Sequence, residues 1–152
     1  MTTRAVVPIL IADDDPDDRD LALDALTECL PRNPLHFVKD GVELLDFLKQ
    51  TGAYKDSDAP RPGVILVDLN MPRMDGREAI AEIKRDPALR QIPIVVLTTS
   101  KAEEDVFRTY DLGVSSYVVK PVTYRALVDV MADLGRYWFD VVMLPDPSAG
   151  DC

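Results

Sequence analysis

The residues best suited to chemistry are acids, a hydroxyl and a lysine that stand at the ends of short apolar runs. These residues are Asp13, Asp14, Asp68, Thr98 and Lys120. Ligands of an open parallel sheet bind beyond the carboxyl ends of its strands. If the apolar runs are parallel strands, we expect these side chains to converge on one small area.

A cluster of carboxylates needs a positive partner. Two carboxylates about 4 Å apart repel each other by roughly 4 kcal/mol at an effective dielectric constant near 20, so the cluster must protonate, separate or bind a cation. Oxygen ligands without histidine or cysteine nearby favour a hard cation, and an open, partly hydrated site suits Mg²⁺. A carboxylate beside the cation can attack a phosphoryl group, while a lysine and a hydroxyl bind the remaining phosphoryl oxygens. The pattern predicts an aspartyl phosphate.

The elements that must position these residues alternate along the chain as short β-branched runs and segments of helical period. This alternation is typical of a parallel sheet with right-handed crossovers. Continuously apolar runs favour strands that helices cover on both faces. The expected strands are 9–12, 35–38, 64–67, 94–97 and 117–119. The expected helices lie around 22–30, 42–48, 79–83, 106–110 and 127–138, the fourth ending at Gly113.

Charge and composition exclude several classes of function. The 152 residues suit one domain, and 17 basic against 27 acidic residues give a formal charge of −10. A field of that sign disfavours direct binding to nucleic acid or to an anionic membrane surface. No apolar run approaches the roughly 18 residues that a membrane helix requires. Because Cys29 and Cys152 form no readable disulfide framework, we expect a cytoplasmic setting.

Taken together, the separated motifs resemble the receiver domain of two-component response regulators. The match runs from about Pro8 to Leu134 and keeps the motifs in order. They are Asp13-Asp14, Val67-Asp68-Leu69-Asn70-Met71-Pro72 with Asp75-Gly76, Leu97-Thr98-Thr99-Ser100, and the stretch from Gly113 to Lys120-Pro121. The resemblance implies an α/β, flavodoxin-like (βα)5 three-layer sandwich, with the 2-1-3-4-5 strand order known for chemotaxis receivers.

The resemblance also implies a role for each residue at the phosphoryl group. Asp68 accepts the phosphoryl group from a sensor histidine kinase, and Lys120 pairs with a phosphoryl oxygen. Thr98 moves toward the phosphoryl group on its arrival, and Tyr117 changes rotamer in concert. The family pattern further implies a cis bond between Lys120 and Pro121.

Metal binding is likewise implied by the family. Asp14, Asp68 and the main-chain carbonyl of Asn70 would bind Mg²⁺ directly, and Asp13 would act through water.

One departure from the family pattern concerns Thr99, because a small residue commonly follows the switch threonine. A bulkier side chain there would hinder the attacking water, so we expect the phosphorylated form to decay slowly.

Residues 1–136 are assigned to the receiver domain and 137–152 to a C-terminal extension whose last residues are frayed. An extension of this length leaves no room for an output domain, so the signal would pass to an effector or phosphotransfer protein by contact. The apolar, aromatic segment 137–145 would either pack on its own core or form a dimer contact. With Asn33-Pro34 and 40–43, it is similar to the single-domain regulators that partner bacterial phytochromes, which implies a homodimer.

Three alternatives were weighed against the receiver interpretation. An aspartyl-nucleophile phosphatase would use Asp13 and Asp15, but no threonine follows at the expected place and no substrate cap fits. Asp15 and Asp17 are better explained as residues that cap the first helix or favour its dipole. A calcium loop is excluded because Asp18 stands where glycine is required. The third alternative is a receiver-like binding module that never takes phosphate, and a phosphorylation assay decides it. In the receiver interpretation, the protein is no enzyme beyond its own phosphoryl transfer and dephosphorylation.

Overall fold

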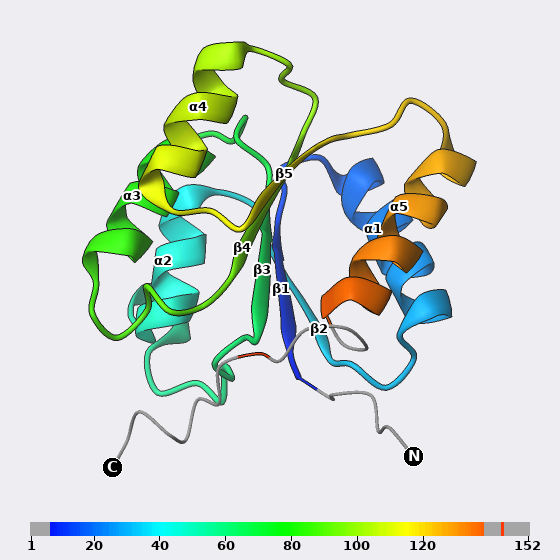
Figure 1. Ribbon diagram of the computed structural model, residues 1–152. Helices are drawn as coiled ribbons and strands as arrows, with labels where there is room; N and C mark the ends of the chain where they lie inside the picture. Colours follow the sequence, from blue (N-terminus) through cyan, green and yellow to red (C-terminus); the bar gives the residue numbers. More distant parts are fainter. Residues whose placement is uncertain (1–6, 139–143, 145–152) are drawn as a thin grey trace.

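A parallel sheet runs through the middle of the molecule, with helices on both faces (Figure 1). The computed structural model describes residues 7–138 and Leu144, and within them five strands form one sheet in the order β2-β1-β3-β4-β5. The strands are β1 (Ile9–Ala12), β2 (Leu35–Val38), β3 (Val64–Val67), β4 (Ile94–Thr98) and β5 (Ser116–Val119). The helices are α1 (Pro16–Cys29), α2 (Gly41–Lys49), the 3-10 turn η1 (Gly52–Tyr54), α3 (Gly76–Arg85), α4 (Glu103–Leu112) and α5 (Tyr124–Arg136). The predicted fold class and strand order are confirmed.

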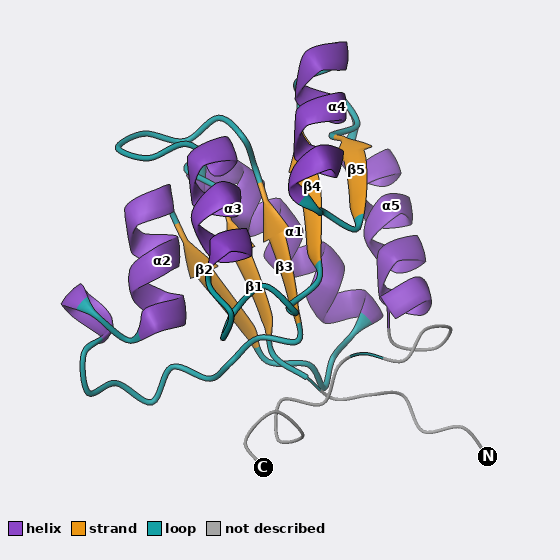
Figure 2. Ribbon diagram, turned by 60° about the vertical axis from the view of Figure 1, so that its left-hand side comes forward, coloured by secondary structure: helices purple, strands orange, loops and turns teal. Residues whose placement is uncertain are grey.

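Each strand divides its side chains between two cores, because successive residues of a strand point to opposite faces. Leu10 and Ile65 belong to the core under α2 and α3, whereas Ile9 and Val64 belong to the core under α1 and α5. Figure 2 shows these two helix layers, with α4 on the side of α2 and α3. Burial on both faces accounts for the continuously apolar sequences of β1, β3 and β4, whose residues are all buried.

Four of the five α-helices begin at a polar residue that accepts a hydrogen bond from a main-chain N–H group of the first turn. These N-cap residues are Asp15, Asp40, Asp75 and Thr123. Such caps satisfy N–H groups that have no partner inside the helix. The expected capping role of Asp15 is confirmed, since its Oδ1 lies 2.9 Å from the Asp17 amide nitrogen. Gly113 ends α4 as predicted, in a left-handed conformation with φ 105°.

The register of the sheet brings the strand ends to one edge. Ala12 pairs with both Val38 and Val67, and Thr98 pairs with Val119. The last pairing makes β4 one residue longer than expected. Asp13, Asp68 and Lys120 therefore follow directly after paired strand ends. The strands end at the upper edge of the sheet in Figure 1.

One prediction made from the family pattern is wrong. The described residues contain no cis peptide bond, so the bond between Lys120 and Pro121 is trans. The trans form is the one that X–Pro bonds favour, by about 0.5–1 kcal/mol.

Part of the predicted C-terminal extension packs on the domain itself. Trp138 is 8% exposed and belongs to the core under α1 and α5, and Leu144 packs against the same core. Tyr137 is half exposed. The other residues of 137–152 lie outside the described part of the chain. None of the helices described is long and apolar enough to cross a membrane.

Candidate functional site

Asp68 lies at the centre of the cluster, directly after β3, and is 7% exposed. Its Oδ1 accepts hydrogen bonds from Thr98 Oγ1 at 2.8 Å and from the Asn70 amide at 3.1 Å. Its Oδ2 lies 2.9 Å from Lys120 Nζ. Both carboxylate oxygens are thus oriented by donors that reach them from β4, the β3–α3 loop and the end of β5.

The loop after Asp68 is held against α3 at a glycine. A Cβ atom on Gly76 would lie 2.5 Å from the Asp68 carbonyl oxygen and 2.8 Å from Leu69 Cα, which is closer than such atoms approach. The Gly76 amide also donates to the Leu69 carbonyl oxygen at 2.9 Å. Glycine at this position therefore lets the start of α3 fix the backbone that carries Asp68.

Asp13 and Lys120 form a tight ion pair beside Asp68. Lys120 Nζ lies 2.6 Å from Asp13 Oδ2, and their side chains are only 10% and 7% exposed. Burial raises the pKa of Asp13, although the hydrogen bond from Lys120 opposes this effect. Burial by itself would lower the pKa of Lys120, but its hydrogen bonds to Asp13, Asp18 and Asp68 raise the pKa above its usual value. The lysine is therefore charged at neutral pH.

Asp13, Asp14 and Asp68 supply a set of ligand atoms that fits a divalent cation. One carboxylate oxygen from each lies within 4.8 Å of the others, and Asp14 is exposed while the other two are buried. A set made of oxygens alone, open to solvent on one side, suits a hard divalent ion that keeps some of its water. Asn70 is adjacent to Asp68, and the role of its carbonyl oxygen as a ligand stays a prediction.

Tyr117 lies next to the loop that follows Thr98. Its hydroxyl donates to the Ser100 carbonyl oxygen at 3.0 Å, and its own amide donates to the Tyr110 hydroxyl at 3.1 Å. Thr98 is the last residue of β4 and Tyr117 lies in β5, so the two predicted switch residues meet through Ser100, which belongs to the β4–α4 connection. Their coordinated movement stays a prediction.

Sequence reasoning missed two contacts at this edge. Asp18, in the first turn of α1, lies 2.8 Å from Lys120 Nζ, whereas the sequence pattern marks it only as a position in a calcium loop. The sequence signal that could have found this contact is the position of Asp18, about one helical turn after Asp13 and Asp14. The other contact is a two-pronged ion pair between Arg77 Nε and Nη2 and the carboxylate of Asp105, with both distances at 2.6 Å.

The Arg77–Asp105 pair joins α3 to α4. It also contacts the switch loop, residues 99–102 between β4 and α4, through Ser100, whose Oγ donates to Asp105 Oδ2 at 2.7 Å. The hydrogen bonds from Arg77 outweigh the effect of burial and, with the bond from Ser100, lower the pKa of Asp105 to about 2. No pattern in the sequence singles out this pair, because its partners lie on different helices.

A 2-1-3-4-5 parallel sheet with an oxygen-only cation site beside a buried aspartate and lysine defines a signalling domain of the receiver type. Comparison with known families matches residues 9–132 to the response regulator receiver domain, and the chain belongs to this family. The resemblance found in the sequence is therefore confirmed, and the phosphatase alternative is not favoured.

Individual relatives match along nearly the whole chain. The response regulator Rcp1 of Synechocystis is 40% identical over 137 residues, which cover 90% of this chain and 92% of Rcp1. The structure of the phosphorylated cyanobacterial phytochrome response regulator RcpA matches with 39% identity and a TM-score of 0.88, covering 93% of this chain and 100% of RcpA. A Mn²⁺-bound structure of Rcp1 matches with 39% identity and a TM-score of 0.85, covering 92% and 99% of the two chains.

Proposed function

We propose that this protein is a single-domain response regulator that takes a phosphoryl group from a histidine kinase onto Asp68, with Mg²⁺ as its cation. The observation that carries this proposal is the setting of Asp68. Its two oxygens accept hydrogen bonds from Thr98 and Lys120, and the oxygens of Asp13 and Asp14 lie beside it.

In the proposed reaction, one carboxylate oxygen of Asp68 attacks the phosphorus atom of a phosphohistidine. The new O–P bond forms as the P–N bond breaks, and the imidazole nitrogen leaves with the electron pair. Lys120 and Thr98 donate hydrogen bonds to phosphoryl oxygens, in place of those that they donate to Asp68. When bound, the cation supplies positive charge that offsets the repulsion between the carboxylate and the phosphoryl oxygens.

Asp13, Asp14 and Asp68 would hold this cation, joined by the carbonyl oxygen of Asn70. The manganese of the Rcp1 structure supports a divalent ion, and Mg²⁺ shares the preference of Mn²⁺ for oxygen ligands. Catalysis by the chain would be confined to its own Asp68, namely phosphoryl transfer and later hydrolysis.

Intact-mass analysis after treatment with acetyl phosphate and Mg²⁺ tests the proposal. We expect the parent chain to gain one phosphoryl group and Asp68→Asn to gain none. Asp17→Asn is a matched control, because it removes an exposed carboxylate from the neighbouring helix turn. Phosphorylation of Asp68→Asn, or no phosphorylation of the parent, would refute the proposal.

We infer that the cognate kinase is coupled to a phytochrome, an inference supported by the similarity to a phytochrome response regulator. Because such a kinase uses ATP, we also infer that the reaction takes place in the cytoplasm. Transfer from an autophosphorylated phytochrome kinase should reach the parent faster than transfer from a kinase with an unrelated sensor. Equal rates from both kinases would contradict the inference.

The strongly acidic charge favours a protein, rather than a nucleic acid, as the next recipient of the signal.

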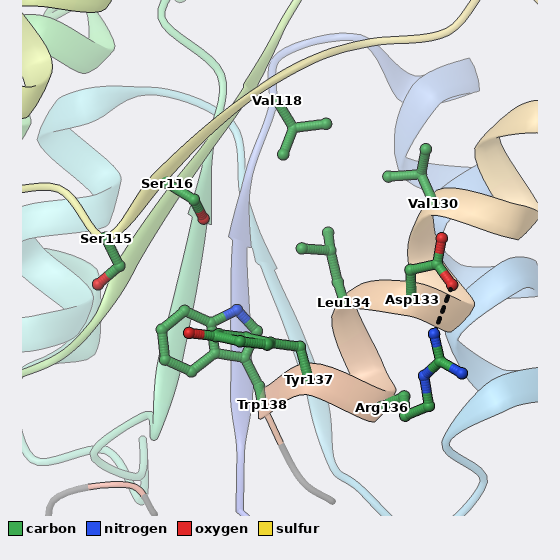
Figure 3. Close-up of a pocket in the computed structure, with 9 residues that line it drawn as sticks. All are labelled: Ser115, Ser116, Val118, Val130, Asp133, Leu134, Arg136, Tyr137 and Trp138. Carbon is green, nitrogen blue, oxygen red and sulfur yellow. Dashed lines mark hydrogen bonds and ion pairs between the residues drawn. The ribbon is translucent and has the colours of Figure 1, made fainter. Parts of the chain in front are cut away.

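We also propose a homodimer in which the extension 137–152 takes part in the contact between the receiver domains, 1–136, of two copies, while its Trp138 stays in the core of its own domain. A pocket of about 750 Å³ lies between β5 and the C-terminal end of α5. Figure 3 shows its walls, which are Ser116 and Val118 on one side, Val130 and Leu134 on the other, and Tyr137 and Trp138 at one end. An apolar pocket beside an exposed tyrosine has the composition of a protein interface.

Sedimentation distinguishes this dimer from a monomer. We expect the intact chain to be dimeric and Ser116→Arg, which places a long cation in the pocket, to be monomeric. A chain ending at Trp138 keeps the buried indole and should also be monomeric. An intact chain that sediments as a monomer, or a dimer unaffected by both changes, would rule out this arrangement.

A further inference from the structure

Lys120 has one more carboxylate partner than the cation cluster accounts for. Its ammonium group has three N–H donors. Its Nζ lies 2.6 Å from Asp13 Oδ2, 2.9 Å from Asp68 Oδ2 and 2.8 Å from Asp18 Oδ2. Asp13 and Asp68 belong to the cation cluster, and Asp18 does not. The Asp18 side chain therefore reaches the site through Lys120.

The exposure of these side chains places Asp18 at the rim of the site. The Asp18 side chain is 36% exposed, compared with 9% for Asp68 and 10% for Lys120. The ammonium group thus lies between the buried acids on one side and Asp18 on the solvent side. Asp18 is held there by α1, which begins at its Asp15 cap immediately before this turn.

The two buried partners of Lys120 are the ones that phosphorylation would change. Asp68 would become esterified, and Asp13 would turn to the cation. Asp18 takes part in neither event, so its carboxylate remains available to Lys120 throughout. This matters because lysine has a flexible four-carbon stem, and rotamer entropy must be lost when the stem is fixed.

We propose that Asp18 is a positioning residue, which keeps Lys120 Nζ at the site while Asp13 and Asp68 pass to the cation and the phosphoryl group. One N–H donor stays on Asp18, and the other two are left for phosphoryl oxygens. This inference rests on the proposed phosphorylation of Asp68. If Asp18 instead competed with the phosphoryl group for Lys120, its removal would speed phosphorylation.

Kinetics of phosphorylation by acetyl phosphate at saturating Mg²⁺ provide the first test. Asp18→Asn should lower kcat about two- to fivefold, the effect of losing a partly exposed ion pair of up to about 1 kcal/mol. Asp17→Asn removes the same charge from the same helix turn and should leave kcat unchanged. Asp18→Glu keeps the carboxylate and should restore part of the rate.

A double-mutant cycle separates positioning from a general effect of charge. In a Lys120→Met background, Asp18→Asn should cause no further loss, because Asp18 would act through the missing ammonium group. The same proportional loss in both backgrounds would overturn the inference.

The Nζ resonance of Lys120 in ¹⁵N NMR spectra gives a readout that does not depend on turnover. With Mg²⁺ and beryllofluoride, a mimic of the phosphoryl group, the signal should stay sharp in the parent and in Asp17→Asn. In Asp18→Asn it should broaden through exchange with solvent.

The outcomes distinguish this inference from the proposed function. If the parent takes no phosphoryl group, the proposed function itself fails. If the parent and Asp17→Asn are phosphorylated alike, and Asp18→Asn is as fast as they are or faster, the positioning role of Asp18 is overturned while phosphorylation of Asp68 stands.

Discussion

The ion pair between Arg77 and Asp105 should stabilise the fold in a way that depends on pH. It joins the first turns of α3 and α4, and Ser100 donates a third hydrogen bond to the same carboxylate. Asp105→Asn removes the charge but keeps the shape and size of the side chain. We expect this variant to unfold at a lower concentration of urea than the parent at pH 7.

The size of the loss follows from the pKa of Asp105, which is lowered from 3.8 to about 2. At 1.36 kcal/mol per pKa unit, the charged form gains about 2 kcal/mol from folding. The two side chains are 11% and 22% exposed, so solvent screens the pair only in part. We therefore expect a loss of about 1–2 kcal/mol in the free energy of unfolding, above the typical value for exposed pairs.

The direction of the pH dependence is set by the lowered pKa in the folded state. The contribution is fully present above the unfolded value of 3.8 and disappears as the pH falls through about 2. Urea unfolding of both proteins from pH 7 to pH 2 measures it. The other carboxylates titrate alike in both proteins, so the difference between the two free energies isolates Asp105.

The matched control is Asp133→Asn, which breaks an exposed pair with Arg136 whose atoms are 3.4 Å apart. It should change stability little at any pH. A difference between Asp105→Asn and the parent that is the same at pH 2 as at pH 7 would refute the electrostatic reasoning. So would a loss at pH 7 no larger than that of the control.

Three further predictions concern the phosphorylation site. Thr99→Ala should speed the decay of the phosphorylated form, followed as loss of phosphoryl mass, because a smaller side chain next to Thr98 admits the attacking water; an unchanged decay rate would count against this. Lys120→Met should slow phosphorylation by acetyl phosphate on the order of 10²-fold, the typical effect of losing one donor to developing charge, and a rate close to that of the parent would contradict the role of the lysine. Gly76→Ala should lower the free energy of unfolding by about 1–3 kcal/mol and should also slow phosphorylation, since its Cβ would lie 2.5 Å from the Asp68 carbonyl oxygen. A normal phosphorylation rate in a destabilised variant would show that the loop carrying Asp68 tolerates the added methyl group.

The sequence was sufficient to predict the helices and strands and the place where the side chains of the site meet. Apolar runs predicted the strands to within a residue at each end, because burial on both faces of a sheet leaves no room for polar alternation. The convergence of Asp13, Asp68, Thr98 and Lys120 followed as well, because parallel strands bring their carboxyl ends to one edge. The prediction of a cis bond before Pro121 was wrong. It rested on the family pattern and not on the residues themselves.

Contacts between helices required the tertiary structure. Whether Asp18 reaches Lys120 depends on how α1 is rotated and tilted over the sheet, and the pairing of Arg77 with Asp105 depends on how α3 and α4 lie side by side. Helical periodicity tells which face of a helix is buried, but it does not tell which polar groups meet at the rim of that face. The positions of the strands and their burial were therefore determined by the pattern of residue types along the chain, whereas the strand order was an implication of the family resemblance. The polar partners that orient the lysine and brace the switch loop were decided by packing.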